Sequence, residues 1–249
     1  MRALITGAGA RVGRAVAIEL GRSGFDVAVH YNRSRAGAEQ TLQRVREAGG
    51  TGWLLQAPLD TVEGCQAVID RVRARWDSLH LLVNNASVFQ PCPFEQITPE
   101  AWSATLNANL RAPFMLSQGL LPLLETPSIT AGAQPGEGNL IVHLTDIGAS
   151  RPVPGYAHYS VSKAGLEMLV RAMAVELSPR VRVLGVAPGQ VCWPEDYPEE
   201  QRAEIAARIP IPRVGTPEDV ATLVRFLSLE APYLNGMIVP VDGGRAARY

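Results

Sequence analysis

Lysine is almost absent from this 249-residue sequence. Lys163 is the only one, and every other basic residue is an arginine. The two side chains differ in shape, hydration and pKa. A chain that uses arginine everywhere else and lysine here indicates that position 163 requires a compact ammonium group.

Cysteine is scarce as well. Cys65, Cys92 and Cys192 form an odd, sparse set without the spacing of a metal site, and the four histidines are scattered. Such a set argues for a reducing compartment and against a disulfide framework. We therefore expect a cytoplasmic protein with no bound metal.

Long apolar runs and excess charge are also missing. No apolar stretch reaches membrane-spanning length, and the net charge is −1. Residues 1–6 lead directly into a glycine turn and lack the length and cleavage site of a secretory signal. No basic run with interleaved aromatic residues indicates a nucleic-acid binder. These absences argue against membrane and nucleic-acid partners, whereas 47% hydrophobic and 19% charged residues suit a compact domain with a large core.

The chain begins with a pattern typical of a nucleotide-binding turn. The apolar run 3–5 precedes Gly7, Gly9 and Gly13, and a helical segment follows. Glycine lets the backbone approach a pyrophosphate, and a helix N-terminus offers free N–H groups to it. The spacing is a dinucleotide fingerprint only in this strand–turn–helix setting. The alternative is an ordinary turn between a strand and a helix.

The end of the second predicted strand indicates which dinucleotide binds. Residues 25–31 read as a strand, and Asn32, Arg33 and Ser34 follow it. An acidic residue here favours the 2′-hydroxyl of NAD, whereas arginine accommodates the 2′-phosphate of NADP. The acid is absent, and a guanidinium and a hydroxyl suit a phosphate, so we expect NADPH. The alternative is that Arg33 and Arg35 are a solvated start of the next helix.

Strand-like and helical segments alternate along the whole chain. The predicted strands are 3–5, 25–31, 52–57, 79–83, 139–144, 181–187 and 236–241. This rhythm predicts a single Rossmann-like α/β domain over residues 1–249, a doubly wound parallel sheet with helices on both faces. Ligands bind such a sheet at the carboxyl ends of its strands, and residues 84–87 follow one of those ends. The polar, Pro-interrupted segment 190–212 is typical of a substrate lid.

Tyr159 and Lys163 are four residues apart and therefore lie on one face of a helix. An ammonium near a phenol favours the phenolate, so we expect Lys163 to lower the Tyr159 pKa from about 10. The tyrosine would then exchange a proton near neutral pH. Alone, a pair with this spacing could equally be accidental on a solvated helix.

With these motifs in order, the chain resembles the short-chain dehydrogenase/reductases over essentially its full length. The matching pieces are 6–13, 84–87, Asn109, Tyr159 with Lys163, 188–189 and 241–244. The resemblance implies a Rossmann-like fold, a homotetramer, and hydride transfer to or from a nicotinamide. It also implies that Lys163 holds the nicotinamide ribose and that Asn109 helps to keep a water near Lys163.

Three departures from the family pattern resemble one subgroup, the pteridine reductases, which reduce dihydropterins and dihydrofolate with NADPH. Arg11 replaces the central glycine of the turn, Asp146 replaces the serine thirteen residues before the tyrosine, and residues 30–34 read His-Tyr-Asn-Arg-Ser. Segment 87–89 also resembles that subgroup, in which the serine contacts cofactor and pterin and the phenylalanine stacks on the pterin ring.

The resemblance gives each candidate residue a role. Catalytic roles fall on Asn109, Asp146, Tyr159 and Lys163. Cofactor contacts are expected from Gly7, Arg11, Val12, Gly13, Tyr31, Asn32, Arg33, Ser34, Leu59, Asn85, Ala86, Ser87, Tyr159, Lys163, Pro188 and Gly189. Substrate contacts are expected from Arg11, Ser87, Phe89, Asp146 and Tyr159.

The sequence thus predicts NADPH-dependent reduction of dihydropterins or dihydrofolate, with Tyr159 as proton donor assisted by Asp146. A carboxylate can hydrogen-bond the tyrosine and help to deliver its proton to a ring nitrogen. The alternative is a carbonyl or 3-oxoacyl thioester reductase of the same family, and a more distant one is a non-catalytic NADPH-binding sensor. Three local alternatives stay open: Arg11 binds only phosphate, Asp146 points away and leaves Thr145 to act, and Phe89 only packs in the pocket.

Overall fold

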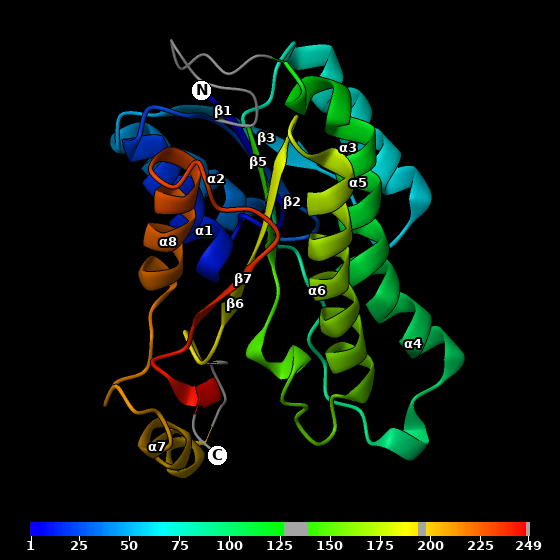
Figure 1. The fold of residues 1–249 in the computed structure, drawn as a ribbon, viewed down its shortest axis with the longest axis vertical. Coiled ribbons are helices and arrows are strands. Elements are labelled where there is room, and N and C mark those ends of the chain that lie inside the picture. Colours follow the sequence, from blue (N-terminus) through cyan, green and yellow to red (C-terminus); the bar gives the residue numbers. More distant parts are fainter. Residues whose placement is uncertain (127–138, 194–197, 248–249) are drawn as a thin grey trace.

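A seven-stranded parallel sheet forms the centre of the molecule (Figure 1). The structure is a computed structural model that describes residues 1–126, 139–193 and 198–247. The strand order is β3-β2-β1-β4-β5-β6-β7, and every neighbouring pair is parallel. This order reverses direction at β1, so the chain winds outward on both sides of it. The predicted single-domain, doubly wound α/β fold is confirmed.

The elements follow the predicted alternation closely. The strands are β1 (Arg2–Ile5), β2 (Asp26–Tyr31), β3 (Thr51–Gln56), β4 (Leu81–Asn84), β5 (Leu140–Leu144), β6 (Arg182–Pro188) and β7 (Ile238–Val241). The α-helices are α1 (Arg11–Arg22), α2 (Arg35–Glu47), α3 (Val62–Arg75), α4 (Pro99–Leu106), α5 (Ala112–Leu124), α6 (Ala157–Leu177), α7 (Glu199–Ala207) and α8 (Pro217–Leu229). The π-helical turn η2 (Asn107–Arg111) joins α4 to α5, and three short 3₁₀ turns complete the described chain: η1 (Phe94–Gln96), η3 (Ile147–Ala149) and η4 (Arg245–Ala247).

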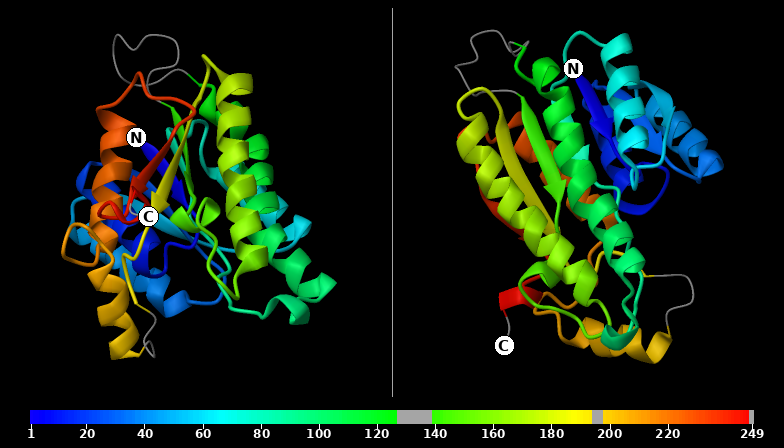
Figure 2. Two further views of the ribbon diagram at one scale, coloured as in Figure 1. Left: turned by 60° about the horizontal axis from the view of Figure 1, so that its bottom comes forward. Right: turned by 90° about the vertical axis from the view of Figure 1, so that its right-hand side faces the viewer.

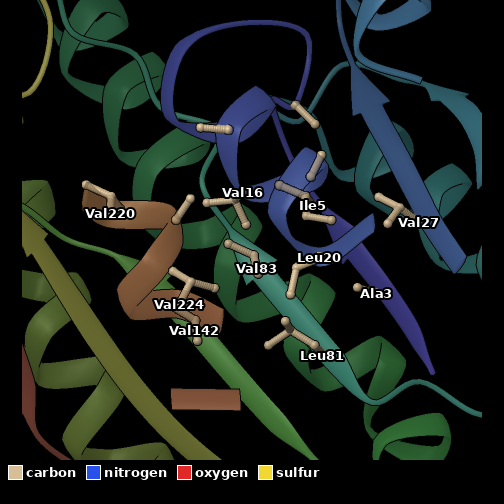
Figure 3. Packing of buried hydrophobic residues seen from close by; sticks show 14 of the residues in the cluster. Ala3, Ile5, Val16, Leu20, Val27, Leu81, Val83, Val142, Val220 and Val224 are labelled. Atoms are coloured by element: carbon tan, nitrogen blue, oxygen red, sulfur yellow. The ribbon is translucent and has the colours of Figure 1, made fainter. Parts of the chain in front are cut away.

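Two helical layers cover the sheet and bury both of its faces. Alternate residues of each strand point to opposite sides. Ile5 therefore packs in the layer of α1, α2 and α8, whereas Leu4 packs in the layer of α3, α5 and α6. In the right-hand view of Figure 2, the second layer lies in front of the sheet. Figure 3 shows the first layer, where Val16 and Leu20 of α1 face the sheet beside Val224 of α8.

The parallel arrangement brings the carboxyl ends of the strands to one edge. In the sheet register, Ile5 pairs with Val83, Asn84 pairs with His143, and Leu144 pairs with Val186. The segments that leave these strands are the glycine turn after β1, residues 85–93 after β4, residues 145–156 after β5 and residues 189–193 after β6. The predicted site residues are therefore gathered by topology alone.

The predicted lid, 190–212, contains helix α7, and its residues 194–197 lie outside the described part of the chain. Backbone hydrogen bonds hold both of its ends. The Gly215 N–H donates to the Gln190 oxygen at 3.0 Å, and the Ile211 N–H donates to the Gly243 oxygen at 3.0 Å. A lid function for this segment stays a prediction.

Within the described ranges, no helix combines the length and the apolar character that crossing a membrane would need.

Candidate active site

Helix α6 carries Tyr159 and Lys163 one turn apart, and both side chains are buried. The Lys163 Nζ donates to the carbonyl oxygen of Leu144, the last residue of β5, at 2.8 Å. The same ammonium lies 5.6 Å from the centre of the Tyr159 ring. The lysine is therefore fixed at the strand edge by the sheet backbone, with the tyrosine beside it.

Asp146 faces the tyrosine. The Tyr159 hydroxyl donates to Asp146 Oδ2 at 2.8 Å, while Asp146 Oδ1 accepts from the Gly148 N–H at 2.6 Å. The second bond caps the short turn η3 and fixes the carboxylate. The alternative in which Asp146 points away is wrong, because its carboxylate accepts from Tyr159. Thr145 does not take its place: it is buried, and its hydroxyl donates to the Val186 oxygen at 3.2 Å.

The expected lowering of the Tyr159 pKa is also wrong. Burial raises the pKa of this phenol, and the neighbouring Asp146 carboxylate raises it further. Both effects disfavour the phenolate, and Lys163 donates its hydrogen bond to the Leu144 oxygen and not to the phenol. The tyrosine is consequently held protonated, as a proton donor must be.

Lys163 is perturbed in the opposite sense. Burial lowers its pKa to about 8, and the negative charge of Asp146 partly offsets this change. An ammonium that loses its proton so close to neutrality depends on its electrostatic partners.

Asn109 connects three segments of the site. It lies buried in the π-helical turn η2, a form often found at functional sites. Its Oδ1 accepts from the Val88 N–H at 2.7 Å and from the Ser87 hydroxyl at 3.1 Å. Its Nδ2 donates to the Val88 oxygen and to the Ser162 hydroxyl, each at 3.0 Å. The side chain thus ties the loop after β4 to helix α6, and its expected water beside Lys163 stays a prediction.

An aromatic wall lies next to the tyrosine. Phe89 stacks on Tyr156 with ring centroids 4.3 Å apart and planes at 12°. The same Phe89 ring meets Tyr159 edge-on at 4.7 Å and 73°, and 52% of Phe89 is exposed. Tyr156 immediately precedes α6, so two loops supply parallel rings beside one hydroxyl.

The glycine turn after β1 has the geometry of a phosphate cradle. Gly7 has a φ of +65°, which favours glycine, and a Cβ on Gly13 would collide with the Gly7 oxygen and the Asn85 amide. The Asn85 Nδ2 donates to the Thr6 oxygen at 2.8 Å, which holds the turn against the end of β4. Helix α1 begins directly after this turn, so its free N–H groups fit a pyrophosphate.

Three predicted cofactor residues are exposed around this cradle. Arg11 has a φ of +48°, a conformation that usually requires glycine, and its guanidinium has no hydrogen bond or ion pair with any described residue. Arg33 is equally without a partner in the described ranges, and Ser34 stands beside it at the start of α2. Two guanidinium groups that have no partner in the described ranges, together with a hydroxyl, fit the phosphates of NADPH.

The other predicted cofactor residues lie along the same edge. Val12 is in the first turn of α1, Tyr31 ends β2, Asn32 follows it, Leu59 follows β3, Ala86 and Ser87 follow β4, Pro188 ends β6 and Gly189 follows it. The Gly189 N–H donates to the Val241 oxygen at 2.9 Å. The structure therefore brings the predicted set together at one edge of the sheet.

Four residues that support this edge were given no role from the sequence: Thr6, His30, Tyr156 and Ser162. The Thr6 hydroxyl accepts from the backbone N–H groups of Asn85 and Ala86, each at 2.9 Å. Ser162 is three residues after Tyr159, so helical spacing alone could have placed it in the site. The other three act through contacts between distant segments, which no local pattern reveals.

The sheet order and this edge define the protein as a Rossmann-type oxidoreductase. A profile described as "Enoyl-(Acyl carrier protein) reductase" matches residues 7–246. The chain is 32% identical to the short chain dehydrogenase mdpC of Emericella nidulans, covering 98% of this chain and 94% of that protein. It is 30% identical to the 3-oxoacyl-[acyl-carrier-protein] reductase FabG of Staphylococcus aureus, covering 97% and 96%. The chain belongs to the short-chain dehydrogenase/reductase family.

Solved structures agree with this assignment. The angucycline C-6 ketoreductase LanV with bound NADP superposes with a TM-score of 0.88 at 27% identity, covering 99% of this chain and 95% of that one. The reductase LugOII, which catalyses keto-reduction at C1 during lugdunomycin biosynthesis, superposes with a TM-score of 0.87 at 30% identity. The match covers 99% of this chain and 97% of that one.

Proposed function

We propose that this oxidoreductase uses NADPH to reduce a carbonyl group on a flat, conjugated substrate, with Tyr159 as the proton donor. The observation that carries the proposal is the buried Tyr159 hydroxyl, which is kept protonated at the carboxyl edge of the sheet beside an aromatic wall. The relatives support the carbonyl, because their names specify a 3-oxoacyl reductase and ketoreductases. They favour the carbonyl alternative over the pterin reading drawn from the sequence.

Each part of the edge has a task in this reaction. The glycine turn and α1 would hold the pyrophosphate, and Arg33 with Ser34 would hold the 2′-phosphate. Bound NADPH supplies the hydride. Tyr159 would turn its O–H from Asp146 to the substrate oxygen and give up its proton there. The Lys163 ammonium would stabilise the phenolate that remains.

The aromatic wall supports a flat substrate. Phe89 and Tyr156 present nearly parallel rings, and half of Phe89 is open to solvent in this structure. Aromatic faces stack favourably on other flat π-systems, by about 0.5–1.5 kcal/mol beyond the area that they bury. A conjugated ketone stacked on this wall would have its carbonyl close to the Tyr159 hydroxyl.

A second candidate, reduction of a dihydropterin, is favoured by Asp146. A carboxylate cannot donate to a carbonyl oxygen, as the serine of most relatives can, but it can accept from an N–H or amino group of a pterin ring. The 2.8 Å bond to Tyr159 would also let Asp146 orient the phenolic proton toward a ring nitrogen.

Steady-state oxidation of NADPH with three substrates separates the two candidates. A flat aromatic ketone should be reduced with the highest kcat/KM, an acetoacetyl thioester more slowly, and dihydrobiopterin not at all. Turnover of dihydrobiopterin alone would replace the carbonyl proposal with the pterin one. Turnover of none of them would favour the sensor alternative.

The Asp146→Ser variant gives an independent reading of the same question. For a carbonyl substrate, serine adds a donor to the oxygen, so we expect kcat/KM to be retained or to rise in assays run well below pH 8, where Lys163 stays protonated. For a pterin, the loss of the carboxylate should lower kcat/KM by about 100-fold. A large loss of ketone reduction in this variant would contradict the carbonyl proposal.

A further inference from the structure

One buried histidine holds the two consecutive amides that begin the glycine turn. His30 lies in β2 and is 1% exposed. The Ala8 N–H donates to the His30 carbonyl oxygen at 2.8 Å, and the Gly7 N–H donates to its Nδ1 at 3.2 Å. On its other side, the imidazole Nε2 lies 3.0 Å from the Ala57 oxygen, just after β3.

These contacts select a single state of the imidazole. Because Nδ1 accepts from an N–H, it carries no proton, so Nε2 must carry the proton and donate it to Ala57. Burial also lowers the His30 pKa to about 4, which keeps the ring neutral at physiological pH. The ring is therefore a fixed bridge between the glycine turn and the end of β3.

Side chains hold both backbone groups of Gly7. Its φ of +65° places it in the left-handed region, and its carbonyl oxygen accepts from the Asn85 Nδ2 at 3.2 Å. With His30 on its N–H, both backbone groups of Gly7 are held by side chains from neighbouring strands. Together with the Ala8 N–H bond to the His30 oxygen, these two bonds help to fix the direction in which the turn presents its remaining N–H groups.

We propose that His30 is a positioning residue for the dinucleotide, holding the glycine turn in the conformation that receives the pyrophosphate. The proposal rests on the NADPH binding of the proposed function but not on the identity of the substrate. His30 lies on β2, whereas the proton donor lies on α6. Its loss should therefore raise the Kd and the KM of NADPH and leave kcat at saturating NADPH unchanged.

The chain contains a matched control at the opposite end of β1. His80 is also buried, and its Nδ1 accepts from the Arg2 N–H at 2.9 Å. Burial is the main cause that lowers its pKa to about 4. It thus holds the first residue of β1 as His30 holds the turn that follows β1, but it lies at the amino edge of the sheet, away from the cofactor cradle.

Two replacements of His30 separate its hydrogen bond with Gly7 from its hydrogen bond with Ala57. The Oδ1 of asparagine can take the place of Nδ1, and the Nε2 of glutamine can take the place of the imidazole Nε2. His30→Asn should therefore keep the Gly7 bond, and His30→Gln should lose it. We would measure the NADPH Kd by fluorescence, the melting temperature, and hydrogen exchange of the Gly7 amide in cofactor-free protein.

His30→Gln should accelerate exchange at Gly7 and weaken NADPH binding about tenfold, because the released turn would be in the receiving conformation only about a tenth of the time before NADPH binds. His30→Asn should stay within about threefold of the wild type, and His80→Gln should lower the melting temperature without changing the Kd. If His30→Gln exchanges faster at Gly7 but binds NADPH normally, or if His80→Gln weakens binding equally, the positioning role is wrong. Wild-type protein that fails to bind NADPH would reject the proposed cofactor as well.

Discussion

The only lysine of the chain occupies a position where its charge is poorly stabilised. Lys163 is 3% exposed, and burial lowers its pKa to about 8, while the Asp146 carboxylate raises it. About half of the ammonium form is thus lost at about pH 8, and it predominates only at lower pH. The composition indicates that this position requires a compact ammonium, and the structure gives that ammonium a pKa only slightly above neutral pH.

The pH dependence of activity should follow the protonation of Lys163. We predict that kcat/KM for reduction falls above about pH 8, because the neutral amine cannot stabilise the Tyr159 phenolate. Asp146→Asn removes the carboxylate that raises the Lys163 pKa, so the limb should move to lower pH. The test is a pH profile of both proteins, and an unshifted limb in the variant would contradict this electrostatic account.

Arg11 combines a strained backbone with a guanidinium that has no partner among the described residues. At a φ of +48°, a residue with a Cβ costs about 1 kcal/mol. In urea unfolding, Arg11→Gly should therefore be more stable than Arg11→Ala by up to about 1 kcal/mol. The greater freedom of glycine in the unfolded chain offsets part of this gain. Both variants should bind NADPH more weakly, because each lacks the guanidinium. Equal affinity to the wild type would mean that Arg11 does not contact the cofactor.

At the scale of elements, Arg182 shows how β6 and α8 are joined. Its buried guanidinium donates to the oxygens of Leu227 at 3.2 Å and Ala231 at 2.9 Å, at and just beyond the end of α8. The last carbonyls of a helix have no partner inside the helix, and a cation there also matches its dipole.

Arg182→Met should cost about 2–3 kcal/mol of unfolding free energy, because it leaves buried carbonyl oxygens unsatisfied. Hydrogen exchange should accelerate in the last turn of α8 more than in α6. Arg182→Lys should recover part of the loss. A methionine variant as stable as the wild type would show that the carbonyls find other partners.

Most elements could be predicted from the sequence, because their signals are local. Apolar runs predicted each strand to within a few residues. The capping box of Thr216 and Asp219 at the start of α8 is a local signal of the same kind. The π-helical form of η2 has no comparable signal. The direction of the Tyr159 pKa shift was wrong because it depends on burial and on Asp146, which only the packed structure determines.

At the scale of the whole molecule, buried histidines couple folding to pH. Burial lowers the pKa of His30 to about 4 and that of His143 to about 3, from 6.5. Each neutral ring therefore contributes stability that is complete above pH 6.5 and is lost as the pH falls toward its folded-state value. A shift of this size corresponds to about 3 kcal/mol or more for each histidine.

We predict that the urea midpoint falls steadily between pH 6.5 and 4. His80→Gln removes one such group, so its own midpoint should depend less steeply on pH. Parallel curves for the two proteins would contradict the assignment.

The homotetramer and the cytoplasmic location stay predictions from the family resemblance and the composition, and sedimentation equilibrium tests the first of them.

In the proposed reaction, Tyr159 gives the proton that accompanies hydride transfer. The most direct measurement is a single-turnover reduction with Tyr159→Phe, monitored by the loss of NADPH absorbance with the best ketone of the substrate panel. Phenylalanine keeps the ring that packs on Phe89, so the NADPH Kd should stay within about twofold. The rate should fall by about 100-fold or more, because the variant lacks the phenolic O–H that would supply the proton. A variant that reduces the ketone at the wild-type rate would contradict the account.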